Sequence, residues 1–168
     1  MATMQTPLRI GTLILKNRFV MTPMNTNYSD ANGCMTPQME EYYVRRAKGG
    51  AGLIVLEAVA VTPDTRNHGV QPMLCDEKYV PAWSNLIERL QSYGAKVSIE
   101  LAHFGSEATL APRASASDVS RFPGVEVEVL TKARIRELQE AFVHTALNAR
   151  MAGADAVTLH GAHGYLLA

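Results

Sequence analysis

The sequence predicts an α/β fold built on a parallel sheet. Short apolar segments alternate with longer amphipathic ones along the 168 residues. One of them, Leu53–Ala58, is almost continuously apolar, as expected of a strand that is covered on both faces. Apolar residues make up 47% of the chain and charged residues 19%, a composition that supports a packed core.

Helix signals separate the four expected strands, which are Arg18–Thr22, Leu53–Ala58, Lys96–Leu101 and Ala156–His160. Thr36-Pro37 opens the first helix, which Lys48-Gly49-Gly50 closes. A second helix is expected over Pro81–Tyr93. Thr131 caps a third, which runs to about Met151. Helical spacing predicts that these residues face the core: Met39, Tyr43, Ala47, Trp83, Leu86, Ile87, Leu90, Ile135, Leu138, Phe142, Ala146 and Ala149.

The expected order of elements is therefore β-α-β-α-β-α-β. Alternation of this kind indicates parallel strands joined by right-handed crossovers. It is compatible with a doubly wound open sheet and with a (β/α)8 barrel. The polar segment Phe104–Gly124 is expected to be an excursion loop that follows the third strand.

Composition limits the classes of protein and partner. Lys plus Arg and Asp plus Glu are both 16, and this zero net charge disfavours general nucleic-acid binding. The two cysteines, Cys34 and Cys75, are expected to be reduced thiols. No apolar run is long enough for a membrane span, and the N-terminus does not resemble a signal peptide. We therefore expect a cytoplasmic protein.

Polar side chains follow each expected strand, where parallel folds place their ligand sites. These strand ends carry Asn25 after Pro23-Met24, Glu57 before Ala58, Glu100, and the segment His160-Gly161-Ala162-His163. A single polar strand end can simply meet solvent. Four in succession favour a ligand site.

His160 and His163 carry the most chemical information. Two ring N–H groups that converge on one carbonyl oxygen would polarise a conjugated double bond. Metal ligation with His103 as a third ligand and a purely structural role are the alternatives. The chain contains no P-loop, no G-x-G-x-x-G after the first strand and no G-x-S-x-G motif.

Three segments resemble the Old Yellow Enzyme family of flavin-dependent ene-reductases, in the family's order. Residues 15–24, Leu-Lys-Asn-Arg-Phe-Val-Met-Thr-Pro-Met, resemble its opening strand, and residues 42–54 resemble its first helix and second strand. Residues 160–167, His-Gly-Ala-His-Gly-Tyr-Leu-Leu, resemble its substrate-binding signature. The branch of 2,4-dienoyl-CoA and enoate reductases is the most similar.

The resemblance implies a (β/α)8 TIM barrel that holds FMN at the carboxyl ends of its strands. NAD(P)H would reduce the flavin, which would reduce the C=C bond of an enone or enoate. Pro23, Met24, Asn25, Ala58 and Glu100 would contact the flavin. His160 and His163 would bind the substrate carbonyl, and Tyr165 and Tyr28 would line the substrate pocket, with no metal involved.

Two side chains and the length depart from the family pattern. Asn25 stands where threonine or cysteine is common, and Glu100 stands where a glutamine binds the pyrimidine edge of the flavin. A (β/α)8 barrel needs about 250 residues, so residues 1–168 are expected to be the N-terminal half of an FMN-binding barrel domain, with only the first four β/α units. Such a half-barrel exposes its edge strands and is expected to form a homodimer if it folds alone.

Three functions remain open at this stage. The leading one is the flavin-facing and substrate-facing portion of an ene-reductase, a fragment expected to be inactive alone. The second is a non-catalytic half-barrel that self-associates without stable flavin binding. The third is a metal-dependent hydrolase that uses His103, His160 and His163.

Overall fold

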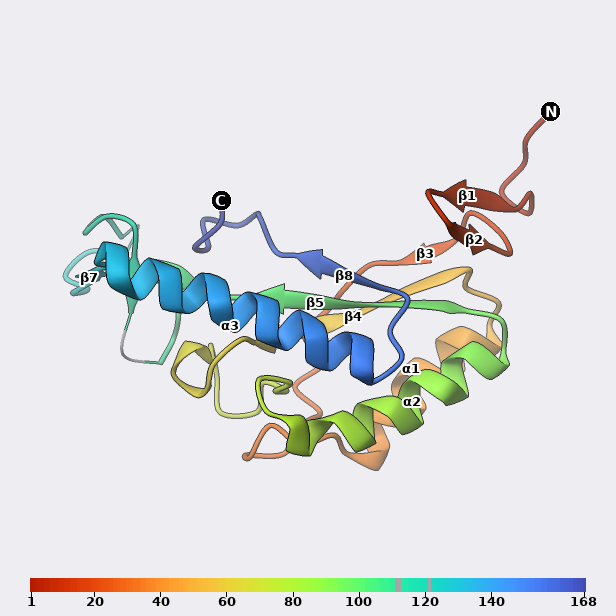
Figure 1. The fold of residues 1–168 in the computed structure, drawn as a ribbon, viewed down its shortest axis with the longest axis horizontal. Coiled ribbons are helices and arrows are strands. Elements are labelled where there is room, and N and C mark those ends of the chain that lie inside the picture. The colour runs from red at the N-terminus through yellow and green to blue at the C-terminus, as the bar shows by residue number, and fades with distance from the viewer. Residues whose placement is uncertain (111–112, 121) are drawn as a thin grey trace.

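The computed structural model describes residues 1–110, 113–120 and 122–168. Over these residues its centre is a parallel sheet with the strand order β3-β4-β5-β8 (Figure 1). These strands are β3 (Val20–Met21), β4 (Leu53–Ala60), β5 (Lys96–Ala102) and β8 (Ala156–Leu159). The predicted α/β class and all four predicted strands are confirmed, although β3 is shorter than expected and β4 is longer.

The three predicted helices are also confirmed. They are α1 (Pro37–Lys48), α2 (Val80–Ser92) and α3 (Lys132–Met151). The Thr36 hydroxyl accepts the Met39 N–H at the start of α1, and the Thr131 hydroxyl accepts the Arg134 N–H at the start of α3. Each hydroxyl satisfies a backbone donor that the first turn of a helix leaves free.

The strand order bears on the two architectures that the sequence left open. The four strands lie side by side in chain order. One buried cluster joins residues of α1, α2 and α3 to β4 and β5, so the three helices share one face of the sheet. A doubly wound sheet reverses direction and covers both faces with helices. The chain is therefore wound in one direction, as the strands of a barrel are.

The core contains most of the residues that helical spacing assigned to it. Tyr43, Trp83, Leu86, Ile87 and Leu90 are all at most 1% exposed. Ile135 is the exception, because its side chain is exposed. It lines an apolar cavity beside Leu166 and Leu167, beyond the layer where α3 packs on the strands.

Several short elements were not predicted. An antiparallel hairpin of β1 (Leu8–Ile10) and β2 (Leu13–Leu15) turns at Gly11. The 3-10 helices η1 (Pro63–Thr65), η2 (Glu77–Tyr79) and η3 (Gly105–Glu107) and the strands β6 (Ala114–Ser115) and β7 (Glu128–Val129) complete the described elements. The predicted loop 104–124 contains η3 and β6, and its residues 111–112 and 121 lie outside the described residues.

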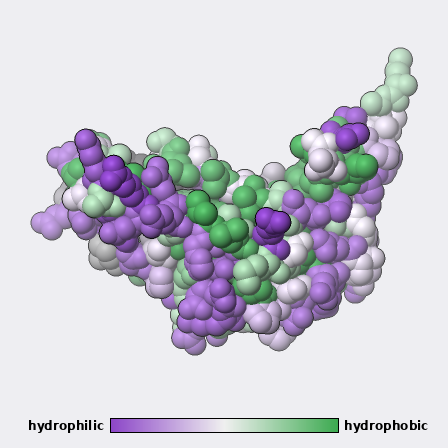
Figure 2. Space-filling view, viewed as in Figure 1, coloured by the Kyte–Doolittle hydropathy of each residue, from purple (hydrophilic) through white to green (hydrophobic). Residues whose placement is uncertain are grey.

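β8 is an edge strand of the sheet. It pairs with β5, and the described residues place no strand on its other side. Figure 2 shows apolar residues across the middle of the face that α3 and β8 present. The exposed apolar side chains on these two elements are Ile135, Val143, Leu147, Met151, Val157 and Leu159.

Cys34 and Cys75 are both free thiols. Burial is the main cause that raises the pKa of the Cys75 thiol. Among the described residues, no helix has the length and apolar character that crossing a membrane requires.

Candidate functional site

One cavity of about 180 Å³ collects residues from the carboxyl ends of all four parallel strands. The loop after β3 contributes Pro23, Met24 and Asn25, β4 contributes Ala58, β5 and its loop contribute Glu100 and Phe104, and the segment after β8 contributes His160, His163 and Tyr165. We call this the strand-end cavity. Eight of these nine residues were predicted to contact flavin or substrate, and Phe104 was not.

His160 and His163 face each other at the end of β8. His160 Nε2 lies 3.2 Å from His163 Nδ1, and the ring centres are 5.0 Å apart. His160 is tied to the sheet by its backbone N–H, which donates to Leu101 O at 3.0 Å. His163 adopts a φ of 63°, so the chain reverses there in the left-handed region. The two imidazoles therefore act as one coupled unit.

The hydrogen bonds also assign protons to the two rings. The Ala162 N–H donates to His160 Nδ1 at 3.4 Å, which leaves the His160 proton on Nε2. That N–H donates to His163 Nδ1, so His163 carries its proton on Nε2. Burial, and then the neighbouring His163, lower the pKa of His160. His160 is therefore a neutral hydrogen-bond donor at neutral pH.

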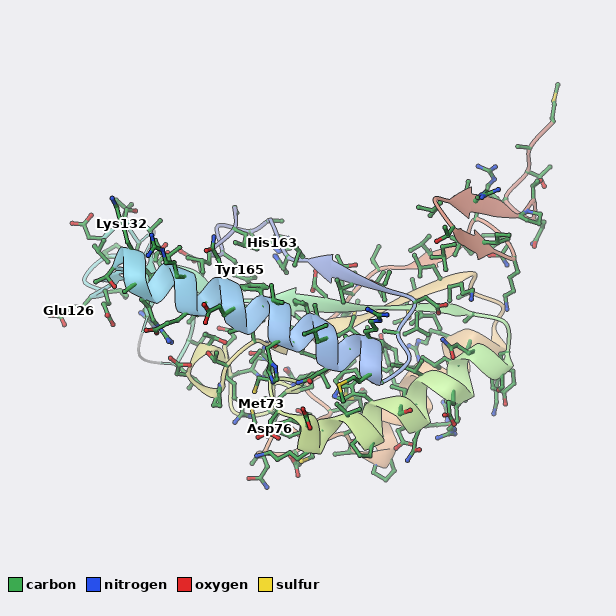
Figure 3. All side chains as sticks on the ribbon, in the orientation of Figure 1. Met73, Asp76, Glu126, Lys132, His163 and Tyr165 are labelled. Atoms are coloured by element: carbon green, nitrogen blue, oxygen red, sulfur yellow. The ribbon has the colours of Figure 1, made fainter. Side chains whose placement is uncertain are left out.

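The segment after β8 docks on the loop after β5. The Tyr165 ring centre lies 4.6 Å from that of Phe104 and 4.7 Å from that of His160. The Leu166 N–H donates to His103 O at 3.1 Å. Gly105 makes this close approach feasible, because a Cβ there would lie 2.9 Å from Leu166 N, and its φ is +61°. Figure 3 shows His163 and Tyr165 together beyond the end of β8.

Glu100 brings an acid into the strand-end cavity. Glu100 is only 8% exposed, and the described residues give its carboxyl no hydrogen-bond partner or ion pair. Burial raises the pKa of Glu100 to about 7. The carboxyl is therefore largely protonated just below neutral pH, and in that form it both donates and accepts hydrogen bonds.

A buried network fixes the loop that carries Pro23, Met24 and Asn25. The Glu57 carboxylate accepts the Thr26 hydroxyl at 2.6 Å, the Thr26 N–H at 3.1 Å and the Tyr43 hydroxyl at 3.0 Å. Burial raises the pKa of Glu57, outweighing these hydrogen bonds. Sequence reasoning noted Glu57 at a strand end but missed this role, because a single sequence does not reveal its partner Thr26.

Two residues that the sequence analysis named, Tyr28 and His103, lie outside the strand-end cavity. Tyr28 lines a neighbouring cavity with residues of α1. His103 lines a small cavity beside Asp64 and Arg134, its Nδ1 accepts the Gly105 N–H, and burial lowers its pKa to about 4. Within the described ranges, no three metal-ligating side chains come together. His103 therefore does not share a cavity with His160 and His163.

Fold and site together define a class of protein. Polar groups from successive parallel strands meet at their carboxyl ends, where α/β enzymes of the barrel type bind their ligands. The chain belongs to the NADH:flavin oxidoreductase / NADH oxidase family, whose model matches residues 3–168. The proposed resemblance to flavin-dependent oxidoreductases is thereby confirmed.

The names of curated relatives agree with this family. An NADH oxidase of Thermoanaerobacter brockii is 40% identical over 95% of this chain and 26% of its own length. An NADPH dehydrogenase of Listeria welshimeri is 41% identical over 95% of this chain and 48% of its own. The chain therefore spans half or less of the length of these relatives.

Solved structures superpose closely on this chain. The Old Yellow Enzyme from Pichia sp. AKU4542 superposes with a TM-score of 0.90 at 28% identity. The match covers 98% of this chain and 47% of that one. Morphinone reductase, at 24% identity and a TM-score of 0.88, shows the fold alone.

The family's cofactor is FMN, with NAD(P)H as reductant, and the chemistry of the residues that line the strand-end cavity suits a flavin ring. A flavin has a flat apolar body and a pyrimidine edge that both donates and accepts hydrogen bonds. Met24 and Ala58 offer apolar wall, while the Asn25 amide and protonated Glu100 donate and accept. The nine lining residues include no lysine or arginine, so they offer the phosphate of FMN no counter-charge.

Proposed function

We propose that this chain supplies the flavin-facing and substrate-facing part of an FMN-dependent, NAD(P)H-consuming oxidoreductase that reduces the C=C bond of α,β-unsaturated carbonyl compounds. The observation that carries the proposal is the strand-end cavity, in which a histidine pair faces residues from three other strand ends. Bound FMN would supply hydride to the alkene. The chain itself orients and polarises the substrate.

The histidine pair suits a carbonyl oxygen as its ligand. His163 presents its Nε2–H, and the His160 Nε2–H becomes available when a carbonyl oxygen replaces His163 Nδ1 as its acceptor. Two N–H donors on one oxygen withdraw electrons from the conjugated double bond. Tyr165, stacked beside both rings, would line the same substrate pocket.

A double substitution tests this role. We expect His160→Ala/His163→Ala to weaken binding of a simple cyclic enone to the FMN-loaded chain by about 100-fold, since each lost hydrogen bond is worth about 1 to 1.5 kcal/mol. FMN affinity, measured by flavin fluorescence, should change less than about threefold on the same reasoning. His144→Ala, an exposed histidine on α3, is the matched control. Equal loss of enone and flavin affinity would show that the pair is structural.

The non-catalytic alternative rests on the missing cation in the strand-end cavity. It predicts that the purified chain leaves FMN fluorescence unchanged and remains colourless after dialysis. Saturable quenching by the chain supports the oxidoreductase, whereas no quenching at any chain concentration supports the self-associating module.

We also propose that residues 1–168 form the N-terminal half of an FMN-binding TIM-barrel domain. The support is the one-directional strand order and the coverage of about half of the Listeria welshimeri relative. The open edge at β8, flanked by exposed Val157 and Leu159, would be covered by further β/α units or by a second copy. We expect the chain alone to be a homodimer in sedimentation experiments, and a monomer would contradict that expectation.

A further inference from the structure

We propose that the cavity beside the strand-end cavity binds an oxyanion, a carboxylate or phosphate group. It has a volume of about 270 Å³ and is lined by Tyr28, Gln38, Glu41, Tyr42, Arg45 and Arg46. We call it the Arg46 cavity. Its place in catalysis rests on the function proposed above, and it would select substrates that carry an acidic group at a distance from the alkene.

Arg46 is the cation around which this cavity is built. Its guanidinium carbon lies 3.5 Å from the centre of the Tyr42 ring, and its Nη1 donates to Tyr42 O at 2.8 Å. Stacking and hydrogen bond together hold the planar group in one orientation before any ligand arrives. No carboxylate among the described residues forms an ion pair with Arg46. Its other N–H donors are therefore available to an anion.

The charged side chains near Arg46 are paired with one another and not with Arg46. Arg45 is paired with Glu41 at 3.3 Å, and Arg89 lies 2.6 Å from Glu40 and 3.9 Å from Glu41. Arg46 is thus the one of these three arginines that has no carboxylate partner among the described residues. A ligand with one negative charge would balance this set.

Tyr28 adds a neutral donor to the Arg46 cavity. Its ring packs edge-on against Tyr42, with centres 5.9 Å apart and planes at 76°. Its backbone is held by Thr26 and Thr36, since its N–H donates to Thr26 Oγ1 and its carbonyl accepts the Thr36 hydroxyl. The described residues offer its own hydroxyl no partner. A phenol beside a guanidinium is a suitable donor set for a carboxylate or phosphate oxygen.

The Arg46 cavity adjoins the strand-end cavity. The Tyr42 hydroxyl contacts Met24 Sδ at 3.9 Å, and Met24 lines the strand-end cavity. Tyr28 follows Met24 by four residues, so their Cα atoms are at most about 14 Å apart. One ligand of modest length could therefore place an enone oxygen on the histidine pair and an acidic group on Arg46.

Titrations of the flavin-free chain with inorganic phosphate, glutarate and adenosine 2′,5′-bisphosphate, at constant ionic strength, test the proposal. We expect saturable binding of at least one probe, weakened tenfold or more by Arg46→Gln and severalfold by Tyr28→Phe. Arg136→Gln removes the same charge from an exposed site on α3 and should change nothing. Binding of glutarate points to the substrate's acidic group, and binding of the bisphosphate alone points to a nicotinamide nucleotide.

Two outcomes would overturn the proposal. One is no saturable binding of any probe, and the other is equal weakening by Arg46→Gln and Arg136→Gln, which would reveal a general charge effect. If Arg46→Gln does not fold, Tyr28→Phe and Arg46→Lys decide, because both should weaken binding while keeping the net charge. His160→Ala/His163→Ala should bind the probes as the native chain does. Failure of the proposed redox function therefore remains distinguishable from failure of this site.

Discussion

Glu100→Gln is the substitution that most directly tests the electrostatics of the strand-end cavity. Burial raises the pKa of Glu100 from 4.5 to about 7. Below about pH 4.5 the carboxyl is protonated in the folded and unfolded states, so burial costs no ionisation energy there. As the pH rises from 4.5 through 7, the unfolded state releases its proton first, and the folded state loses relative stability.

The size of this loss of stability follows from the two pKa values of Glu100, 4.5 and about 7. Their difference, at about 1.36 kcal/mol per pH unit, corresponds to a full penalty of about 3 kcal/mol above pH 7. Water at the mouth of the cavity screens part of it, so we expect about 1 to 3 kcal/mol. Glutamine has the same shape and no charge. Glu100→Gln should therefore raise the free energy of unfolding by that amount at pH 8 and change it little at pH 4.

Urea denaturation of both proteins at pH 4, 6 and 8 measures the difference. Glu88→Gln, on an exposed position of α2, is the matched control and should be neutral throughout. A stability difference between native chain and Glu100→Gln that does not grow between pH 4 and 8 would refute the reasoning. An equal gain in Glu88→Gln would do the same, because it would assign the effect to net charge.

Three further changes have defined outcomes. Burial opposes ionisation of Asp155, but hydrogen bonds from Lys96, the Val97 N–H and Gln91 outweigh burial and lower the pKa of Asp155. The ionised carboxylate therefore stabilises the folded state above about pH 3.8, and this stabilisation is lost in acid. Asp155→Asn should cost about 1 to 3 kcal/mol at pH 7 and little at pH 2.5 in thermal or urea unfolding, and an equal cost at both pH values would contradict this. Gly105→Ala places a Cβ 2.9 Å from Leu166 N, so enone binding should weaken while Gly124→Ala, with open space around it, leaves binding intact. Tyr43→Phe removes the hydroxyl that pairs with both the Glu57 N–H and the Glu57 carboxylate and should cost about 1 to 3 kcal/mol in urea unfolding, whereas exposed Tyr93→Phe should be neutral.

The sheet and helices were predictable because their signals are local. The run Leu53–Ala58 is a buried strand by composition alone, and Thr36-Pro37 and Thr131 mark helix starts by their own capping chemistry. The hairpin Leu8–Leu15 was missed because its strands have only three residues each and turn at a lone glycine. Ile135 was misplaced because helical spacing defines a face of α3, and does not show how far the sheet extends beneath it.

The residues of the candidate site also divide into those that the sequence could predict and those that it could not. Strand ends of a parallel sheet converge by geometry, so Pro23, Ala58, Glu100 and His160 could be grouped from the order of strands along the chain. Phe104 and the partners of Glu57 depend on how loops return to the sheet, which single-sequence patterns do not encode. Tyr28 was assigned to the substrate pocket by resemblance, whereas the loop 26–28 carries it toward α1.

The histidine pair stands at the tip of an edge strand, and this has a consequence for how its affinity is controlled. The backbone carbonyls of Leu101 and His103 accept the N–H groups of His160 and Leu166 and so brace that tip from the β5 side. The described residues provide no brace on the opposite side. Whatever docks alongside β8 will stiffen the two donors and lower the entropy that a ligand must remove. Assembly should therefore tune recognition through the rigidity of these donors, in addition to any contact that it makes with the ligand.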